Sequence, residues 1–196
     1  MTPLSRSDRF ERETSSAPSI VIAFLWGLAE ATLFFIVPDV YLGLVALFNW
    51  RRGAWATAAA VVGAMAGGAV MYALAANDGD ALMQLLTRVP LVNSNMVSGI
   101  GEQMRREGLL AMVTGPLQGI PYKVYAVQAG AQQLPFPLFL LFTILARLER
   151  LLPVTCAFSV VGVVFKKTIS RHVALVLCVY GLMWLGIYVL YYFRFR

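Results

Sequence analysis

The chain has 196 residues, of which 59% are hydrophobic and only 13% are charged, and its formal net charge is +6. Soluble domains carry about 25% charged residues, so this composition excludes an ordinary water-soluble domain. The apolar residues form blocks much longer than the roughly ten residues of a transmembrane β-strand, and the longest match the roughly 20 residues of a membrane-spanning helix. We therefore predict an all-α integral membrane protein, built as a small polytopic helical bundle.

The N-terminal quarter divides into a polar part and an apolar part. Residues 1–17 hold three arginines and three acidic residues. We expect a polar N-terminal segment there and a single transmembrane domain over 18–196. Residues 18–50 are apolar apart from Glu30 and Asp39, and a Pro-Asp pair interrupts them. We predict that this broken segment enters the membrane and leaves it on the same side, as a re-entrant segment.

A span rich in glycine and alanine follows at 53–76, without any charge. Gly63 and Gly67 lie on it four residues apart, a spacing that lets two helix backbones approach closely. This pattern indicates tight helix packing rather than chemistry. Residues 78–108 then mix apolar and charged residues, which predicts an interfacial helical segment.

The stretch 109–134 is apolar but interrupted by several glycines and prolines, with Lys123 as its single charge. Such a sequence does not form a continuous helix, and irregular backbone at membrane depth is tolerated only inside protein or beside a wet cavity. We predict a second re-entrant segment here. Two further spans are expected at 135–165 and 172–193, the first as one long helix with buried charges in its middle.

If both broken segments re-enter, the basic flanking residues divide eight against five between the two faces. The eight are Arg6, Arg9, Arg12, Arg51, Arg52, Lys166, Lys167 and Arg171, and the five are Arg88, Arg105, Arg106, Arg194 and Arg196. The positive-inside rule then favours a cytoplasmic N-terminus.

Five ionisable residues within apolar sequence are the candidate site. They are Glu30, Asp39, Lys123, Arg147 and Arg150. Each would cost about 2.5–3.5 kcal/mol at the centre of an isolated inserted helix, so they must pair with one another or face water. Arg147 and Arg150 are three residues apart and share one helix face, whereas Glu149 points away and is expected to be a local charge partner.

Purely structural roles are the alternative for the same residues. Glu30 would then pair with Arg147 and lock the bundle, and the Lys123 ammonium would reach an interface along its apolar stem.

The two broken segments also share a short similarity. Residues 36–41 (Ile-Val-Pro-Asp-Val-Tyr) resemble residues 119–125 (Gly-Ile-Pro-Tyr-Lys-Val-Tyr), with one residue inserted. Two Pro-interrupted apolar segments in corresponding halves of a chain indicate a transporter with its site near the midplane of the bilayer.

Taken in order, these features resemble the DedA family, the bacterial relatives of the VTT (SNARE-associated Golgi) proteins. The features are a Glu in an apolar segment, a Pro-Asp break, a small-residue span, an Ile-Pro-Tyr-Lys-Val stretch and an Arg-x-x-Arg helix, over about residues 20–165. An arginine that precedes the proline in the best-known branch is absent, with Leu117 or Gln118 in its place.

The resemblance implies two re-entrant hairpins that face each other in a bacterial cytoplasmic (inner) membrane, and movement of lipids across it by a flippase or scramblase activity. It places a membrane-embedded acidic pair at Glu30 and Asp39, for proton coupling. It places the basic residues of the substrate site at Lys123, Arg147 and Arg150.

Our leading hypothesis is a transporter of a phosphate-bearing lipid, either a polyprenyl phosphate or a phospholipid, with protons as a second partner. Arginines and Lys123 would bind the headgroup phosphate, because charge-assisted contacts are strongest in a desolvated site. The alternatives are a proton-coupled antiporter for a small cation or drug, and a membrane assembly factor that transports nothing. A homo-oligomer is compatible with each of these.

Other classes of function lack the residues that they require. His172 is the sole histidine, and Cys156 and Cys178 form no metal-ligand spacing, so we predict no metal, no cofactor and no enzymatic activity. A nucleic-acid partner needs a basic groove with stacking aromatic residues, and the sequence contains no such pattern.

Overall fold

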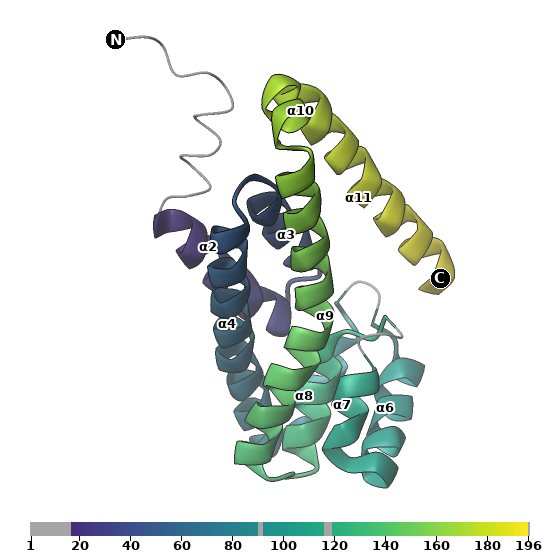
Figure 1. Cartoon of the computed structure of the whole chain (residues 1–196). Helices are drawn as coiled ribbons and strands as arrows, with labels where there is room; N and C mark the ends of the chain where they lie inside the picture. The colour runs from purple at the N-terminus through teal and green to yellow at the C-terminus, as the bar shows by residue number, and fades with distance from the viewer. Residues whose placement is uncertain (1–16, 90–91, 116–118, 196) are drawn as a thin grey trace.

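A computed structural model describes residues 17–89, 92–115 and 119–195 (Figure 1). Within these ranges every regular element is a helix and no strand occurs, which confirms the all-α prediction. Except for its last residue, the polar segment predicted at 1–17 lies outside the described residues, as do Leu117 and Gln118.

The first half of the chain is a helical hairpin followed by a long helix. Helix α2 (Ala17–Ala31) and helix α3 (Asp39–Phe48) are separated by the non-helical residues 32–38, and helix α4 (Trp50–Asn77) follows. Pro38 is the residue before the first turn of α3, a place where its missing N–H leaves no helical hydrogen bond unmade. The apolar sequence continues through the loop, so α2 ends well before the end of the apolar stretch.

The second half repeats this order with an additional pair of helices in front. Helices α5 (Gly79–Leu86) and α6 (Ser94–Glu107) come first, and a 3₁₀ turn, η1 (Gly108–Leu110), leads into the short α7 (Ala111–Thr114). After the break come α8 (Tyr122–Ala131) and the 29-residue α9 (Phe136–Val164).

The segment expected to be interfacial therefore forms two amphipathic helices. Their apolar faces bury leucine, valine, isoleucine and methionine side chains in the same core cluster as α8: Leu82, Leu86, Val97, Ile100 and Met104.

The chain ends with a short turn of helix and a long, exposed helix. Helix α10 (Lys166–Arg171) reverses the direction of the chain, and α11 (Val173–Phe195) runs back along the bundle while diverging from it (Figure 1). It contacts the first hairpin, at the start of α3 and in the loop before it, through two hydroxyl groups. Tyr180 donates to the Val40 carbonyl at 2.6 Å, and Tyr188 accepts from the Val37 amide at 3.0 Å.

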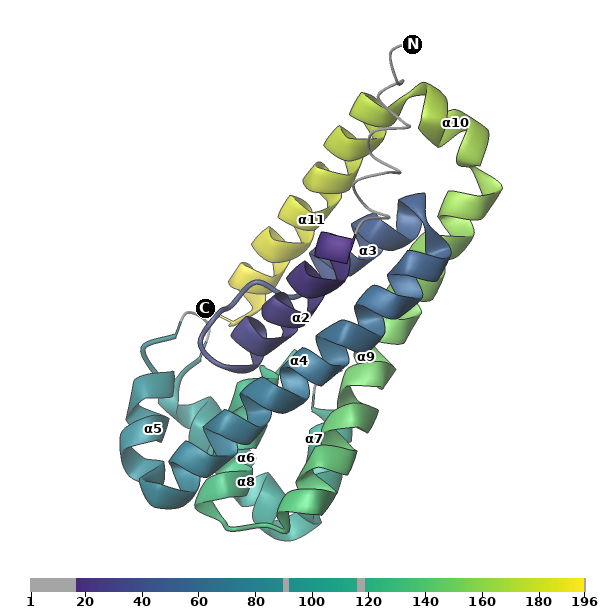
Figure 2. The same cartoon turned by 90° about the vertical axis from the view of Figure 1, so that its left-hand side faces the viewer.

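The two long helices α4 and α9 lie side by side and run in opposite directions (Figures 1 and 2). A buried hydrogen bond of 2.8 Å between the Thr57 and Thr155 hydroxyls joins them. The α2–α3 hairpin packs along one half of this pair, and α5 to α8 pack along the other half (Figure 2).

Glycines set the closest helix contacts. A Cβ atom at Gly63 of α4 would overlap the Phe24 carbonyl of α2, and one at Gly162 of α9 would overlap the Leu47 carbonyl of α3. Such backbone-to-backbone approach is available only where no side chain intervenes. The packing role predicted for Gly63 is therefore visible in the α2–α4 contact.

In the part of the chain that the structure describes, two helices are long and apolar enough to cross a membrane: α4 and the Val173–Leu190 part of α11. Helix α9 is longer than either, but each 18-residue stretch of it contains Arg147, Glu149 and Arg150. Large apolar side chains are exposed along α2, α4, α9 and α11, as on surfaces that face a membrane or another protein.

Candidate functional site

The five predicted residues come together where the loop of the first hairpin and the start of α8 meet the middle of α9. Each residue has a distinct place in the fold. Glu30 is the penultimate residue of α2, Asp39 begins α3, Lys123 is the second residue of α8, and Arg147 and Arg150 lie at the centre of α9. The breaks in the hairpins are what allow residues from three further helices to reach one face of α9.

Glu30 and Arg147 form the innermost pair. The Glu30 Oε2 atom lies 2.5 Å from Arg147 Nη2, and the two side chains are only 4% and 3% exposed. The guanidinium also lies over the Tyr122 ring, 4.1 Å from its centroid, a cation–π contact. The Arg147 Nε atom is buried and has no hydrogen-bond partner among the described residues, so part of its donor capacity remains unused.

Asp39 and Arg150 form a second, more accessible pair. Asp39 Oδ2 lies 3.3 Å from Arg150 Nη2, with Asp39 buried and the Arg150 side chain 24% exposed. Asp39 stands in the first turn of α3, where the helix dipole favours a carboxylate. Its Oδ1 atom has no hydrogen-bond partner in the described part of the chain.

Lys123 is the base whose observed partner is not an acid. Its ammonium donates to the Phe34 carbonyl at 2.5 Å, and the residue is 2% exposed. This bond joins the loop of the first hairpin to the start of α8 in the second. The first turn of α8 is the positive end of its helix dipole, where a cation is disfavoured and an anion is favoured, so the dipole and the ammonium together attract anions.

Two tyrosines belong to this site and were not predicted from the sequence. Tyr122 is fully buried, stacks on Arg147, and shares a 2.8 Å hydrogen bond with the Thr143 hydroxyl of α9. Tyr188 of α11 holds the backbone next to Asp39 through the Val37 amide. The position of Tyr122 beside Lys123 was a usable signal, whereas nothing in the pattern of α11 distinguishes Tyr188 from its aromatic neighbours.

Glu149 was expected to be a local charge partner, and its surroundings differ from that expectation. Within the described ranges it forms no ion pair, and its Oε2 atom is buried without a hydrogen-bond partner. Pro153 lies four residues later and cannot donate to the Glu149 carbonyl. Glu149 lies on the side of α9 away from Arg147, so it takes no part in the pair that Arg147 forms with Glu30.

The short sequence similarity corresponds to equivalent places in the two halves. Pro38 precedes the 10-residue α3, Pro121 precedes the 10-residue α8, and each short helix leads into a long one. Each short helix also packs on the long helix of the other half: Gly162 of α9 approaches α3, and Gly130 of α8 approaches the Tyr72 carbonyl of α4. The two halves therefore have the same order of elements, and their long helices α4 and α9 run in opposite directions.

With all five side chains ionised, three bases stand against two acids and leave one positive charge. A site of this kind can bind an anion by exchanging carboxylate contacts for contacts with the ligand. No group of three or more His, Cys, Asp and Glu side chains in the described ranges is placed to hold a metal ion.

The chain was compared with protein-family models, curated proteins and solved structures, and nothing in any of these three groups matches it.

Proposed function

We propose that this chain is an integral protein of a bacterial cytoplasmic membrane that moves a phosphate-bearing lipid from one leaflet to the other. The observation that carries the proposal is the position of Lys123, a buried base held by a carbonyl between two arginine–carboxylate pairs. A phosphate is the anion that lysine and paired arginines bind best in a desolvated site.

The exposed apolar surface supports a membrane location. Charged groups inside a bilayer are costly and mark pathways for substrates or protons. Here the charges gather at the middle of α9, which at about 1.5 Å per residue is about 44 Å long. The cluster would therefore lie near the centre of a hydrocarbon core about 30 Å thick.

The proposed mechanism follows from the two arginine–carboxylate pairs. Arg150 is the most accessible of the three bases, so the phosphate would meet it first and compete with Asp39 for its guanidinium. Arg147 and Lys123 would then receive the headgroup deeper in the bundle, while the lipid tail stays in the bilayer. Protonation of Glu30 or Asp39 would free a base for the phosphate, which couples lipid movement to protons.

Membership of the DedA family is part of this proposal. It is supported by the order of the motifs and by the contact inside the bundle between the loop of the first hairpin and the start of α8, where Lys123 is joined to Phe34. In a membrane, hairpins of this kind would enter from opposite faces without crossing.

The test uses purified protein in liposomes that carry a fluorescent polyprenyl phosphate or phosphatidylglycerol. Lipid in the outer leaflet is bleached with a membrane-impermeant reductant, and the loss of the protected inner pool reports movement. We expect Lys123→Gln to slow this movement at least about tenfold, because a hydrogen bond from a charged donor contributes about 1.5–3 kcal/mol. A pH gradient should change the rate if protons are coupled.

Arg105→Gln is the matched control. Arg105 forms an exposed ion pair with Glu102 on α6, a helix that carries none of the five cluster residues, and its loss should leave the rate unchanged. No movement of any lipid phosphate above empty liposomes would overturn the proposal. Proton flux driven by a small cation, dependent on Glu30 but not on Lys123, would instead favour the antiporter.

A further inference from the structure

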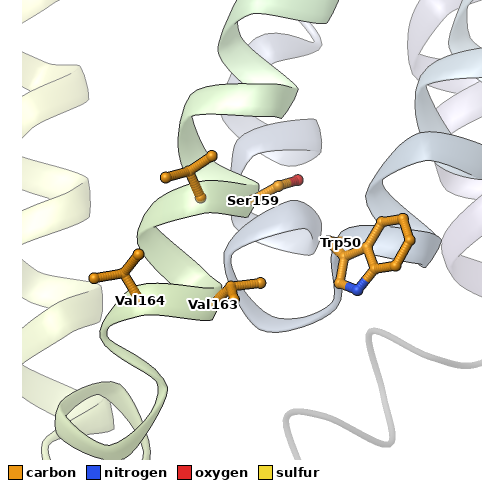
Figure 3. Close-up of a pocket in the computed structure, with 5 residues that line it drawn as sticks. Trp50, Ser159, Val163 and Val164 are labelled. Atoms are coloured by element: carbon orange, nitrogen blue, oxygen red, sulfur yellow. The ribbon is translucent and has the colours of Figure 1, made fainter.

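An apolar groove lies between the start of α4 and the last turns of α9 (Figure 3). Its volume is about 420 Å³, and its lining is Trp50, Ser159, Val160, Val163 and Val164. The three valines are 61–66% exposed and the indole is 52% exposed. Such a hollow has the shape and polarity to hold a hydrocarbon chain.

Basic residues border one end of this groove. The Arg51 guanidinium lies over the Trp50 ring, 5.2 Å from its centroid. Lys166 follows Val164 by two residues, so their Cα atoms are at most about 7.6 Å apart, and Lys167 and Arg52 adjoin these two. The sequence contains no acidic residue between 40 and 77 or between 151 and 195, so the described helices at this end present only positive charge.

Apolar side chains come first and basic side chains follow at the end of α9, in the same order as the acyl chain and headgroup of a lipid. Val160 and Val164 are about 6 Å apart along the helix axis, and Lys166, the first residue of α10, follows two residues after Val164. Tryptophan and arginine mark the boundary between hydrocarbon and headgroups in membrane proteins. In a bilayer the groove would therefore face hydrocarbon at Val160 and headgroups at Arg51 and Lys166.

We propose that this groove binds an anionic phospholipid, with an acyl chain along Trp50 and the valines and the phosphate among Arg51, Arg52, Lys166 and Lys167. Ser159 lies nine residues beyond Arg150, about 13 Å along α9, so this site is separate from the central charge cluster. The inference rests on the proposed membrane location and not on lipid movement.

The test follows the fluorescence of Trp50 in a variant in which Trp26, Trp55 and Trp184 are phenylalanine. The protein is reconstituted in mixed phosphatidylglycerol and phosphatidylcholine, with quenching bromine atoms on the chains of only one lipid at a time. We expect brominated phosphatidylglycerol to quench Trp50 well beyond its share of the bilayer, and brominated phosphatidylcholine below its share.

Two variants test separately whether lipid binding needs the basic residues and whether it needs the open groove. Arg51→Gln with Lys166→Gln should reduce the preference for phosphatidylglycerol at least about fivefold, because each basic residue near a headgroup contributes roughly that factor. Val163→Phe keeps the charges but fills the groove, and should reduce quenching by the same lipid. The control pair, Arg88→Gln with Arg105→Gln, removes two charges from the opposite end and should change nothing.

Equal quenching by both lipids would overturn the inference, as would a preference that survives the loss of Arg51 and Lys166. If Val163→Phe has no effect, the lipid is held by a basic surface and not by this groove. If neither lipid reaches Trp50 and cross-linking traps a dimer, a second copy covers the groove. None of these readouts requires transport, so a failure of the proposed function would leave the result interpretable.

Discussion

At the scale of single residues, the two buried ion pairs explain how charges persist in such an apolar bundle. Glu30 and Arg147 are both almost inaccessible, and their contact is an ion pair without hydrogen-bond alignment. Buried pairs of this kind contribute little net stability, yet they are costly to break. Neither side chain can therefore lose its partner at low cost unless another opposite charge replaces it.

We predict that Glu30→Met lowers the free energy of unfolding by about 3–5 kcal/mol, because it leaves the Arg147 guanidinium buried without a counter-charge. The double variant Glu30→Met with Arg147→Met should recover most of this loss but should move no lipid phosphate. Denaturant titration in mixed micelles measures the first effect, and the liposome assay measures the second. Wild-type lipid movement by the double variant would show that the pair only locks the bundle.

Much of this site was predictable from the cost of burying charge, which singled out all five residues. Their pairing was only partly predictable. Glu30 with Arg147 was anticipated as a structural alternative, whereas the Lys123 contact with the Phe34 carbonyl depends on where the first hairpin turns. Tyr122 was missed because a tyrosine in apolar sequence is unremarkable until its ring is found beneath a guanidinium.

At the scale of helices, glycine determines which surfaces meet. We predict that Gly63→Ala destabilises the protein by about 1–3 kcal/mol, because the added methyl group overlaps the Phe24 carbonyl and forces α2 away from α4. The matched control is Gly181→Ala on α11, where a Cβ atom meets nothing within 4 Å. The control should be neutral or stabilising by up to about 1 kcal/mol. Equal effects of the two changes in thermal unfolding would refute close packing at Gly63.

The attachment of α11 gives a second prediction at this scale. Tyr188→Phe removes the acceptor of the Val37 amide, so residues 32–38 should exchange amide hydrogens roughly two- to tenfold faster, given about 0.5–1.5 kcal/mol for one hydrogen bond. Ile187→Val, on an exposed part of α11, is the control. Unchanged exchange in the Tyr188 variant would mean that α11 does not hold the loop beside Asp39.

Element positions were predicted well where hydropathy and breakers agreed, and poorly where a loop is itself apolar. The long helix over Phe136–Val164 follows from one block that is too short for two spans. In contrast, residues 32–38 are as apolar as the helix before them, so hydropathy alone does not reveal their loop. The loop depends on contacts such as the hydrogen bond from Trp26 Nε1 to the Ile36 carbonyl at 3.0 Å. Hydropathy contains no information about such a contact.

At the scale of the whole molecule, the arrangement of charge predicts how the chain is oriented. In a cysteine-free background, a cysteine at Lys167 should react with an impermeant maleimide only from the cytoplasmic side. A cysteine at Gly99, which is exposed on α6, should react only from the opposite side, because α9 lies between the two positions in the chain and would cross the bilayer. Labelling of both positions from one side would contradict the proposed topology.

The pairing of distant residues also constrains how the protein is made. More than a hundred residues separate each acid from its arginine, and a ribosome adds about 5–20 residues per second. The first hairpin therefore waits roughly 5–20 s in the nascent chain before its counter-charges are synthesised. During that interval its two carboxylates must remain near the membrane surface or stay bound to the insertion machinery. Truncated chains that end before α9 should consequently be recognised as unassembled and degraded.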